Sequence, residues 1–174
     1  MLIGEKVRLR LLEREDIEMI ARWRNDPRIS RQFFGIWPLP ISEQERWYEG
    51  YLTDPTERMW IIETPQGQAI GTMALLHIDH RNQSAEIGRV LIGDSNHLAA
   101  ECASEALQLL ATFAFLEANL NRLYVHVLQG NESAIKLYEG SGFQQEGILR
   151  RAVWKSGQFL DVIEMAMLRG DLND

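Results

Sequence analysis

The stretch Asn131–Phe143, NESAIKLYEGSGF, decides how the rest of the chain is interpreted. It begins with an asparagine, a residue that favours the N-cap of a helix, and glycines near Gly140 suit a helix C-terminus. Ala134 and Tyr138 fall on the same face of a helix with this spacing. The stretch therefore predicts a short helix that begins at Asn131 and ends near the glycines.

The segments before this helix predict a β-α-β unit. Residues 122–128, RLYVHVL, read as a strand, and residues 98–118 carry an apolar stripe with helical spacing. Residues 85–93 form a third strand-like run. Strands that flank a crossover helix run parallel, and the carboxyl ends of parallel strands that diverge form a crevice suited to a ligand. We therefore expect a ligand site within residues 85–128 and at the Asn131 helix.

The other elements extend this unit into one α/β domain that covers residues 1–174. Ser42 with Glu45 predicts a capping box that opens a helix. The remaining expected elements are strands at 7–12, 59–63, 69–78, 143–154 and 159–168, a helix from 15 or 16 to about 25, and a hairpin turn at 155–158. The order predicts a mixed sheet.

Charge and composition exclude several classes of protein. The net charge is −7 and no block of lysines and arginines occurs, which argues against nucleic-acid binding and slightly favours cationic or amine-bearing partners. The first residues, MLIGEKVRLRLLERED, contain no long apolar segment, so we expect neither a signal peptide nor a membrane span. With 45% hydrophobic residues the chain can build a core, and we expect a cytoplasmic protein.

No metal site is expected. Cys102 is the single cysteine, so it can form neither an internal disulfide nor a CxxC site. The nearest grouping of histidines is His77-Ile78-Asp79-His80. On a regular strand this spacing places His77 and Asp79 on one face and His80 on the other, which does not suit a shared metal ion.

The Asn131–Phe143 block resembles the N-x-x-A-x-x-L-Y-E-K-x-G-F signature of the GNAT acyl-CoA N-acyltransferases, and the order of elements is similar too. WRND at 23–26, SAEIG at 84–88 and FLDVIEMAML at 159–168 resemble the branch with ribosomal-protein N-terminal acetyltransferases and spermidine acetyltransferases. The resemblance implies a single-domain GNAT fold: a mixed, mostly antiparallel sheet with helices on both faces and a splayed central β-α-β unit. Related enzymes often dimerise, which leaves a homodimer open.

The resemblance also implies roles for individual residues. Tyr138 matches the general acid of the family, and Glu86 is a candidate base, directly or through water. An interruption near Gly88 would free the backbone of Val90, Leu91 and Ile92 to bind acetyl-CoA and stabilise an oxyanion. Further cofactor contacts are implied at Leu98, Ala99, Ala100, Glu101, Cys102, Ala103, Asn131 and Ala134. Three of these residues have a structural alternative: Tyr138 in core packing, Glu86 as a solvated strand residue, and Glu101 as an anion that favours the first turn of a helix. For Asn131, capping the helix and contacting the cofactor are compatible roles.

Four aromatic residues are candidates for the wall of an acceptor pocket: Phe33, Phe34, Trp37 and Trp154. Packing in the core is an equally good interpretation of such side chains.

The match fails at the pyrophosphate loop. When SEAL at 104–107 is aligned with the family's TEAL, Ala99-Ala100-Glu101 falls on the usual G-K-G. A carboxylate about 4 Å from a phosphate would be repelled by roughly 4 kcal/mol at an effective dielectric of 20. Two hypotheses follow. The first is a metal-independent N-acetyltransferase that passes the acetyl group of acetyl-CoA directly to a primary amine of a protein N-terminus, a polyamine or another small molecule. The alternative is a GNAT-fold pseudoenzyme or binding module with weakened or lost acetyl-CoA binding.

Overall fold

One eight-stranded sheet organises the chain in this computed structural model, which describes residues 1–30, 33–35, 37–93 and 99–172. Its strands are β1 (Leu2–Ile3), β2 (Arg8–Leu11), β3 (Arg58–Glu63), β4 (Ala69–Asp79), β5 (Ser84–Ile92), β6 (Arg122–Leu128), β7 (Gln144–Lys155) and β8 (Gln158–Leu168). The order across the sheet is β1-β2-β3-β4-β5-β6-β8-β7. β5 and β6 pair in parallel and the other neighbours are antiparallel, which confirms the predicted mixed sheet.

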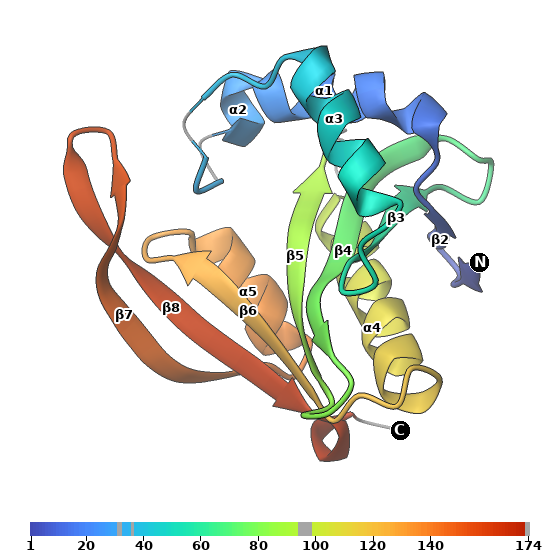
Figure 1. Cartoon of the computed structure of the whole chain (residues 1–174). Coiled ribbons are helices and arrows are strands. Elements are labelled where there is room, and N and C mark those ends of the chain that lie inside the picture. Colours follow the sequence, from blue (N-terminus) through green and yellow to red (C-terminus); the bar gives the residue numbers. More distant parts are fainter. Residues whose placement is uncertain (31–32, 36, 94–98, 173–174) are drawn as a thin grey trace.

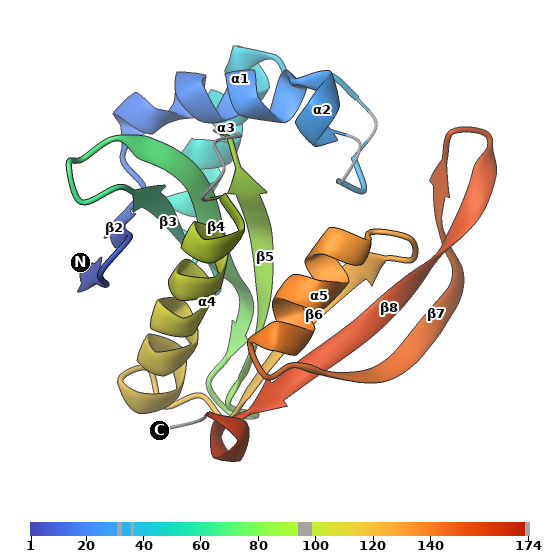
Figure 2. The same cartoon turned by 180° about the vertical axis from the view of Figure 1, so that it is seen from behind.

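Helices cover both faces of this sheet. They are η1 (Arg14–Asp16), α1 (Ile17–Asn25), α2 (Pro27–Ser30), α3 (Ile41–Tyr51), α4 (Ala99–Leu116), α5 (Glu132–Gly140) and η2 (Arg169–Asp171). α4 and α5 lie on one face, whereas α3 lies on the other (Figures 1 and 2). Within the described ranges, none of these helices combines the length and the hydropathy needed to span a bilayer.

Strand alternation divides the apolar side chains between two cores. On β3, Trp60 and Ile62 belong to a large cluster with buried residues of α4 and α5, whereas Met59 and Ile61 belong to a smaller cluster with α1 and α3. Successive residues of a strand point to opposite faces, so a strand covered on both sides becomes apolar throughout. This explains why β3 and β4 read as nearly continuous apolar runs in the sequence.

The parallel pair is short, and the two strands then diverge. Ser84, Ala85 and Glu86 of β5 pair with β6, the last pair being Glu86 with Tyr124. Beyond it β5 continues to Ile92 and stays paired with β4, while β6 continues beside β8. The two strands separate as a V (Figure 1). We call the space between them the split, and it confirms the predicted splayed unit.

A β-bulge lies on β5 just beyond the apex of the split. Thr72 pairs with Leu91 and Ala74 pairs with Gly88, so β5 carries one more residue than β4 over this interval. Arg89 has a φ of 50°, and its carbonyl oxygen accepts a hydrogen bond of 2.7 Å from the Thr72 hydroxyl. The interruption expected near Gly88 is therefore present, centred on the next residue.

Two local expectations were wrong. α3 begins at Ile41 with Pro40 as its N-cap, and no side chain caps it. The amides of Glu43 and Gln44 bond to the Pro40 carbonyl instead, so the Ser42–Glu45 capping box does not form.

The second concerns the His77–His80 segment. β4 is bulged between Leu76 and Asp79, and His77 has a φ of 52°, so its side chains do not alternate as on a regular strand.

Gly71 on β4 allows β5 to approach closely, which generates a stability prediction. A Cβ at this position would lie 2.3 Å from the carbonyl oxygen of Leu91, a backbone atom that cannot rotate away. We expect Gly71→Ala to lower the free energy of unfolding by about 2 kcal/mol, as overpacking does. Gly147→Ala on β7 is the matched control, because no heavy atom lies within 4 Å of its Cβ. Urea denaturation measures both; equal effects would contradict this account of Gly71.

Candidate functional site

The two predicted catalytic residues lie on opposite faces of the sheet, with Glu86 at the apex of the split. Ala85 and Ile87 belong to the core under α4, so Glu86 between them faces the other side. Tyr138 lies on α5, which covers the same face as α4, and its ring packs edge-on against Phe143 at 5.5 Å between centroids. The split therefore separates a carboxylate on one face from a phenol on the other.

Tyr138 is buried, which agrees with the interpretation of its ring as part of the core. Burial raises the pKa of its hydroxyl well above the ordinary value, and the negative charge of Glu86 raises it further. Tyr138 consequently keeps its proton at neutral pH.

Glu86 is contacted by two histidines that the sequence interpretation did not assign to the site. Its Oε2 lies 3.0 Å from Nδ1 of His77 on β4, and its Oε1 lies 3.2 Å from Nδ1 of His126 on β6. The side chain of Glu86 is 16% exposed, so it is not the freely solvated strand residue of the alternative interpretation. His126 could have been found, because RLYVHVL alternates and so places Tyr124 and His126 on one face.

Beyond the apex, the β6-facing side of β5 has no strand partner among the described residues. The backbone of Val90, Leu91 and Ile92, where the resemblance implies cofactor contacts, runs along this side. The adjacent Arg89 side chain turns outward, donating hydrogen bonds of 2.8 and 3.3 Å to Glu57 and lying 4.6 Å from the Trp47 ring. Its charge is therefore balanced locally.

The start of α4 holds Glu101 in an ion pair. Glu101 accepts a hydrogen bond from Lys6, and this contact raises the pKa of the lysine. One turn later, Glu105 accepts hydrogen bonds of 2.6, 2.8 and 3.0 Å from the amides of Glu5, Lys6 and Val7. The carboxylate that replaces the family's loop glycine is thus exposed and paired.

The rest of this predicted loop is only partly described. Leu98 lies outside the described residues, and Ala99 is the first helical residue. Ala100 is exposed, whereas Cys102 and Ala103 are buried. Burial raises the pKa of the Cys102 thiol, which keeps it protonated.

Asn131 caps α5 as predicted. Its Oδ1 accepts hydrogen bonds from the amide of Ala134 at 3.3 Å and from the hydroxyl of Ser133 at 3.0 Å. Position 131 thus fixes the start of the helix that carries Tyr138.

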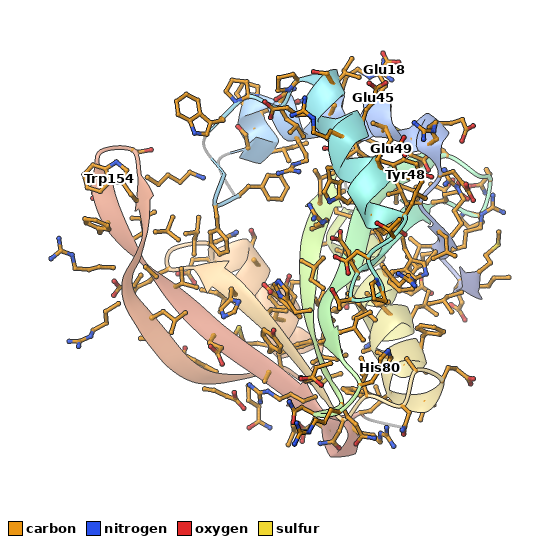
Figure 3. The ribbon with its side chains drawn as sticks, viewed as in Figure 1. Glu18, Glu45, Tyr48, Glu49, His80 and Trp154 are labelled. Atoms are coloured by element: carbon orange, nitrogen blue, oxygen red, sulfur yellow. The ribbon has the colours of Figure 1, made fainter. Side chains whose placement is uncertain are left out.

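The aromatic candidates lie at the surface. Trp37 is 85% exposed, and Phe34 and Trp154 are exposed too, so core packing is wrong for these three. Phe33 is half-buried. Trp154 lies at the tip of the β7–β8 hairpin (Figure 3). The neighbouring Lys155 donates hydrogen bonds to the carbonyls of Ser30 and Phe33, which brings the hairpin tip to the segment that holds Phe33.

Among the described residues, no group of three or more His, Cys, Asp or Glu side chains is arranged to hold a metal ion. In the His77–His80 segment, the carboxylate of Asp79 is engaged by the amides of Arg81 and Asn82 at 2.9 Å each.

Comparison with known proteins gives consistent matches over the chain. A family model described as "Acetyltransferase (GNAT) domain" matches residues 6–144. "Uncharacterized N-acetyltransferase p20" of Bacillus licheniformis is 32% identical over 173 residues, covering 97% of this chain and 96% of the relative. "Spermidine N(1)-acetyltransferase" of Vibrio cholerae is 29% identical over 167 residues, covering 96% and 95%. A crystal structure of the Vibrio cholerae spermidine N-acetyltransferase with CoA and spermine superposes with a TM-score of 0.86 at 29% identity, covering 98% of this chain and 100% of that one.

Proposed function

This chain belongs to the GNAT acetyltransferase family, and on that premise we propose that it transfers the acetyl group of acetyl-CoA directly to a primary amine of a polyamine. The observation that carries the proposal is the position of Glu86 at the apex of the split, with Tyr138 on the opposite face of the sheet. An acceptor that reaches Glu86 from one face and a thioester held from the other would meet within the split.

The two residues have complementary roles in this reaction. Glu86 takes a proton from the acceptor ammonium, and the free amine attacks the carbonyl carbon of the thioester. The new C–N bond forms, the C–S bond breaks, and Tyr138 donates its proton to the leaving thiolate. As the intermediate collapses, the nitrogen loses its second surplus proton, which replaces the one that Tyr138 has donated. The proton taken by Glu86 goes to solvent, and the products are the N-acetylated amine and CoA. Holding both substrates in line reduces the entropic barrier to attack.

The cofactor would be held by backbone groups. The unpaired edge of Val90–Ile92 supplies donors for the pantetheine arm and for the developing oxyanion. Residues 99–103 at the start of α4 would receive the pyrophosphate, as helix N-termini do for anions. Asn131 and Ala134 complete the contacts from α5. The pseudoenzyme alternative depended on a free carboxylate at Glu101, and Lys6 balances that charge.

Several observations favour a polyamine as the acceptor. The Vibrio cholerae relative is named for spermidine, and its crystal structure contains spermine. The net charge of −7 favours the approach of a polycation. Glu86 and Glu164 present carboxylates on the acceptor face, both within hydrogen-bond reach of His126. The exposed rings of Trp37 and Trp154 can contact a cationic chain.

The roles of Glu86 and Tyr138 predict a specific kinetic pattern. We expect Tyr138→Phe and Glu86→Gln each to lower kcat for spermidine by about 100-fold and to change KM much less, because each removes a proton-transfer group and keeps the size of the side chain. Thiol release and mass spectrometry of the acetylated amine measure both.

Tyr48→Phe is the matched control, since Tyr48 on α3 is equally buried but distant from the split (Figure 3). We expect wild-type kcat for this variant. Lack of acetylation of spermidine and spermine by the wild-type protein at millimolar concentrations would refute the acceptor proposal.

The Lys6 ion pair predicts the behaviour of Glu101. We expect Glu101→Gln to change the Kd of CoA by less than about 3-fold, because an exposed and paired carboxylate is strongly screened. Lys6→Ala should weaken CoA binding by more than the Glu101 change does, and the double variant should restore it. Calorimetric titration measures all three; a tenfold tightening in Glu101→Gln alone would show that the carboxylate opposes the cofactor.

A further inference from the structure

We propose that His77 and His126 are positioning residues that hold the carboxylate of Glu86 in its orientation at the apex of the split. The proposal rests on the role of Glu86 as base in the proposed function. The two histidines come from the strands on either side of β5, and each contacts a different carboxylate oxygen. Glu86 is therefore held from both sides within the sheet.

The contacts define the protonation of both rings. An ionised carboxylate only accepts hydrogen bonds, so Nδ1 of His77 and Nδ1 of His126 must each carry a proton to donate at 3.0 and 3.2 Å. The hydrogen bond made by one ring nitrogen sets the tautomer of a histidine. Each carboxylate oxygen has a second lone pair, and those of Glu86 remain available to an acceptor ammonium.

The backbone at His77 is shaped for this contact. Leu76 pairs with Glu86 and Asp79 pairs with Ser84, so β4 carries one extra residue here. On a regular strand the residue after Leu76 would point to the face covered by α4. His77, with its φ of 52°, instead reaches Glu86 on the opposite, acceptor face. A left-handed conformation is unfavourable for histidine, and such strain persists where the surroundings impose it, often at functional sites.

His126 is anchored by further residues. Its Nε2 lies 3.4 Å from Glu164 on β8, and its ring packs edge-on against Tyr124 at 5.7 Å between centroids. Glu164 lies 3.6 Å from Arg122, which also pairs with Glu146 on β7. His126 is 23% exposed whereas His77 is 71% exposed. The ring of His126 is thus enclosed by Tyr124 and by carboxylates that Arg122 holds in turn. The ring of His77 approaches Glu86 from the solvent side, where the β4 bulge places it.

A fixed carboxylate matters because small errors of position are costly in catalysis. A displacement of about 1 Å can reduce the rate by about 100-fold. Without its two donors, Glu86 would be free to rotate about its side-chain torsions. We therefore expect loss of either donor to reduce kcat and to leave KM nearly unchanged.

The kinetic test compares variants that remove the donor with variants that keep it. His77→Gly and His126→Ala remove it, and glycine also suits the left-handed backbone at position 77. His77→Asn and His126→Asn place a side-chain amide where Nδ1 was, and asparagine tolerates the left-handed region. We expect about 10-fold lower kcat for the first pair and kcat within about 3-fold of wild type for the second. His80→Gly, in the turn of the β4–β5 hairpin (Figure 3), is the control and should be neutral.

The spectroscopic test does not need an acceptor. Nitrogen-15 NMR of the imidazole rings of the wild-type protein, without substrates, should show a protonated Nδ1 in both histidines. Glu86→Gln should remove the proton from Nδ1 in at least one ring, because an amide presents one acceptor and one donor.

The outcomes separate this inference from the proposed function. If the Asn variants lose as much kcat as the Gly and Ala variants, or if neither ring is Nδ1–H, positioning is wrong. If Nδ1 is protonated in both rings but spermidine is not acetylated, the acceptor proposal fails, whereas the two histidines still position Glu86. If Glu86→Gln leaves kcat unchanged, Glu86 is not the base, and the inference fails with it.

Discussion

The structure depends on the point at which β5 and β6 stop pairing. Three residue pairs hold the strands together, and the last joins Glu86 to Tyr124. Each strand then follows its other neighbour: β5 remains on β4 and β6 remains on β8. Backbone groups left without a partner inside a sheet need one from elsewhere, because a buried and unpaired amide or carbonyl is costly. A ligand that supplies hydrogen bonds along this edge satisfies the requirement, and the same opening gives two faces access to one point.

Two bulges flank that point, and both place a non-glycine residue in the left-handed region. Arg89 on β5 and His77 on β4 have φ values of 50° and 52°. The first redirects β5 beyond Glu86, and the second turns an imidazole toward Glu86. Arginine and histidine do not favour a positive φ as glycine does, so neighbouring contacts must hold each backbone in place. Thr72 and Glu57 contact Arg89, and Glu86 contacts His77. Local strain and the position of the carboxylate are thus parts of one arrangement.

Local sequence patterns predicted the helices and strands around the split well. The cap at Asn131, the strand at 122–128 and the GNAT family assignment are confirmed, and family membership confirms the expectation of an acetyltransferase. The two histidines were missed for a physical reason. Their contacts depend on register and on a bulge, and a one-residue change of register moves a side chain to the other face. The Ser42–Glu45 capping box does not form because the helix begins at Ile41, and the Pro40 carbonyl accepts the first hydrogen bonds.

Glu101 illustrates why a motif cannot be judged from its own residues. Its replacement of a loop glycine suggested a disabled phosphate site, because an unpaired carboxylate would oppose the favourable helix terminus. The residue that changes this conclusion is Lys6, which lies far away in the sequence but beside Glu101 in the fold. Glu105 brings it there by binding the amides of residues 5–7. The segment between β1 and β2 therefore supplies the positive charge that the loop lacks. In the proposed function, phosphate binding at α4 would depend on how this N-terminal segment is docked as well as on the loop itself.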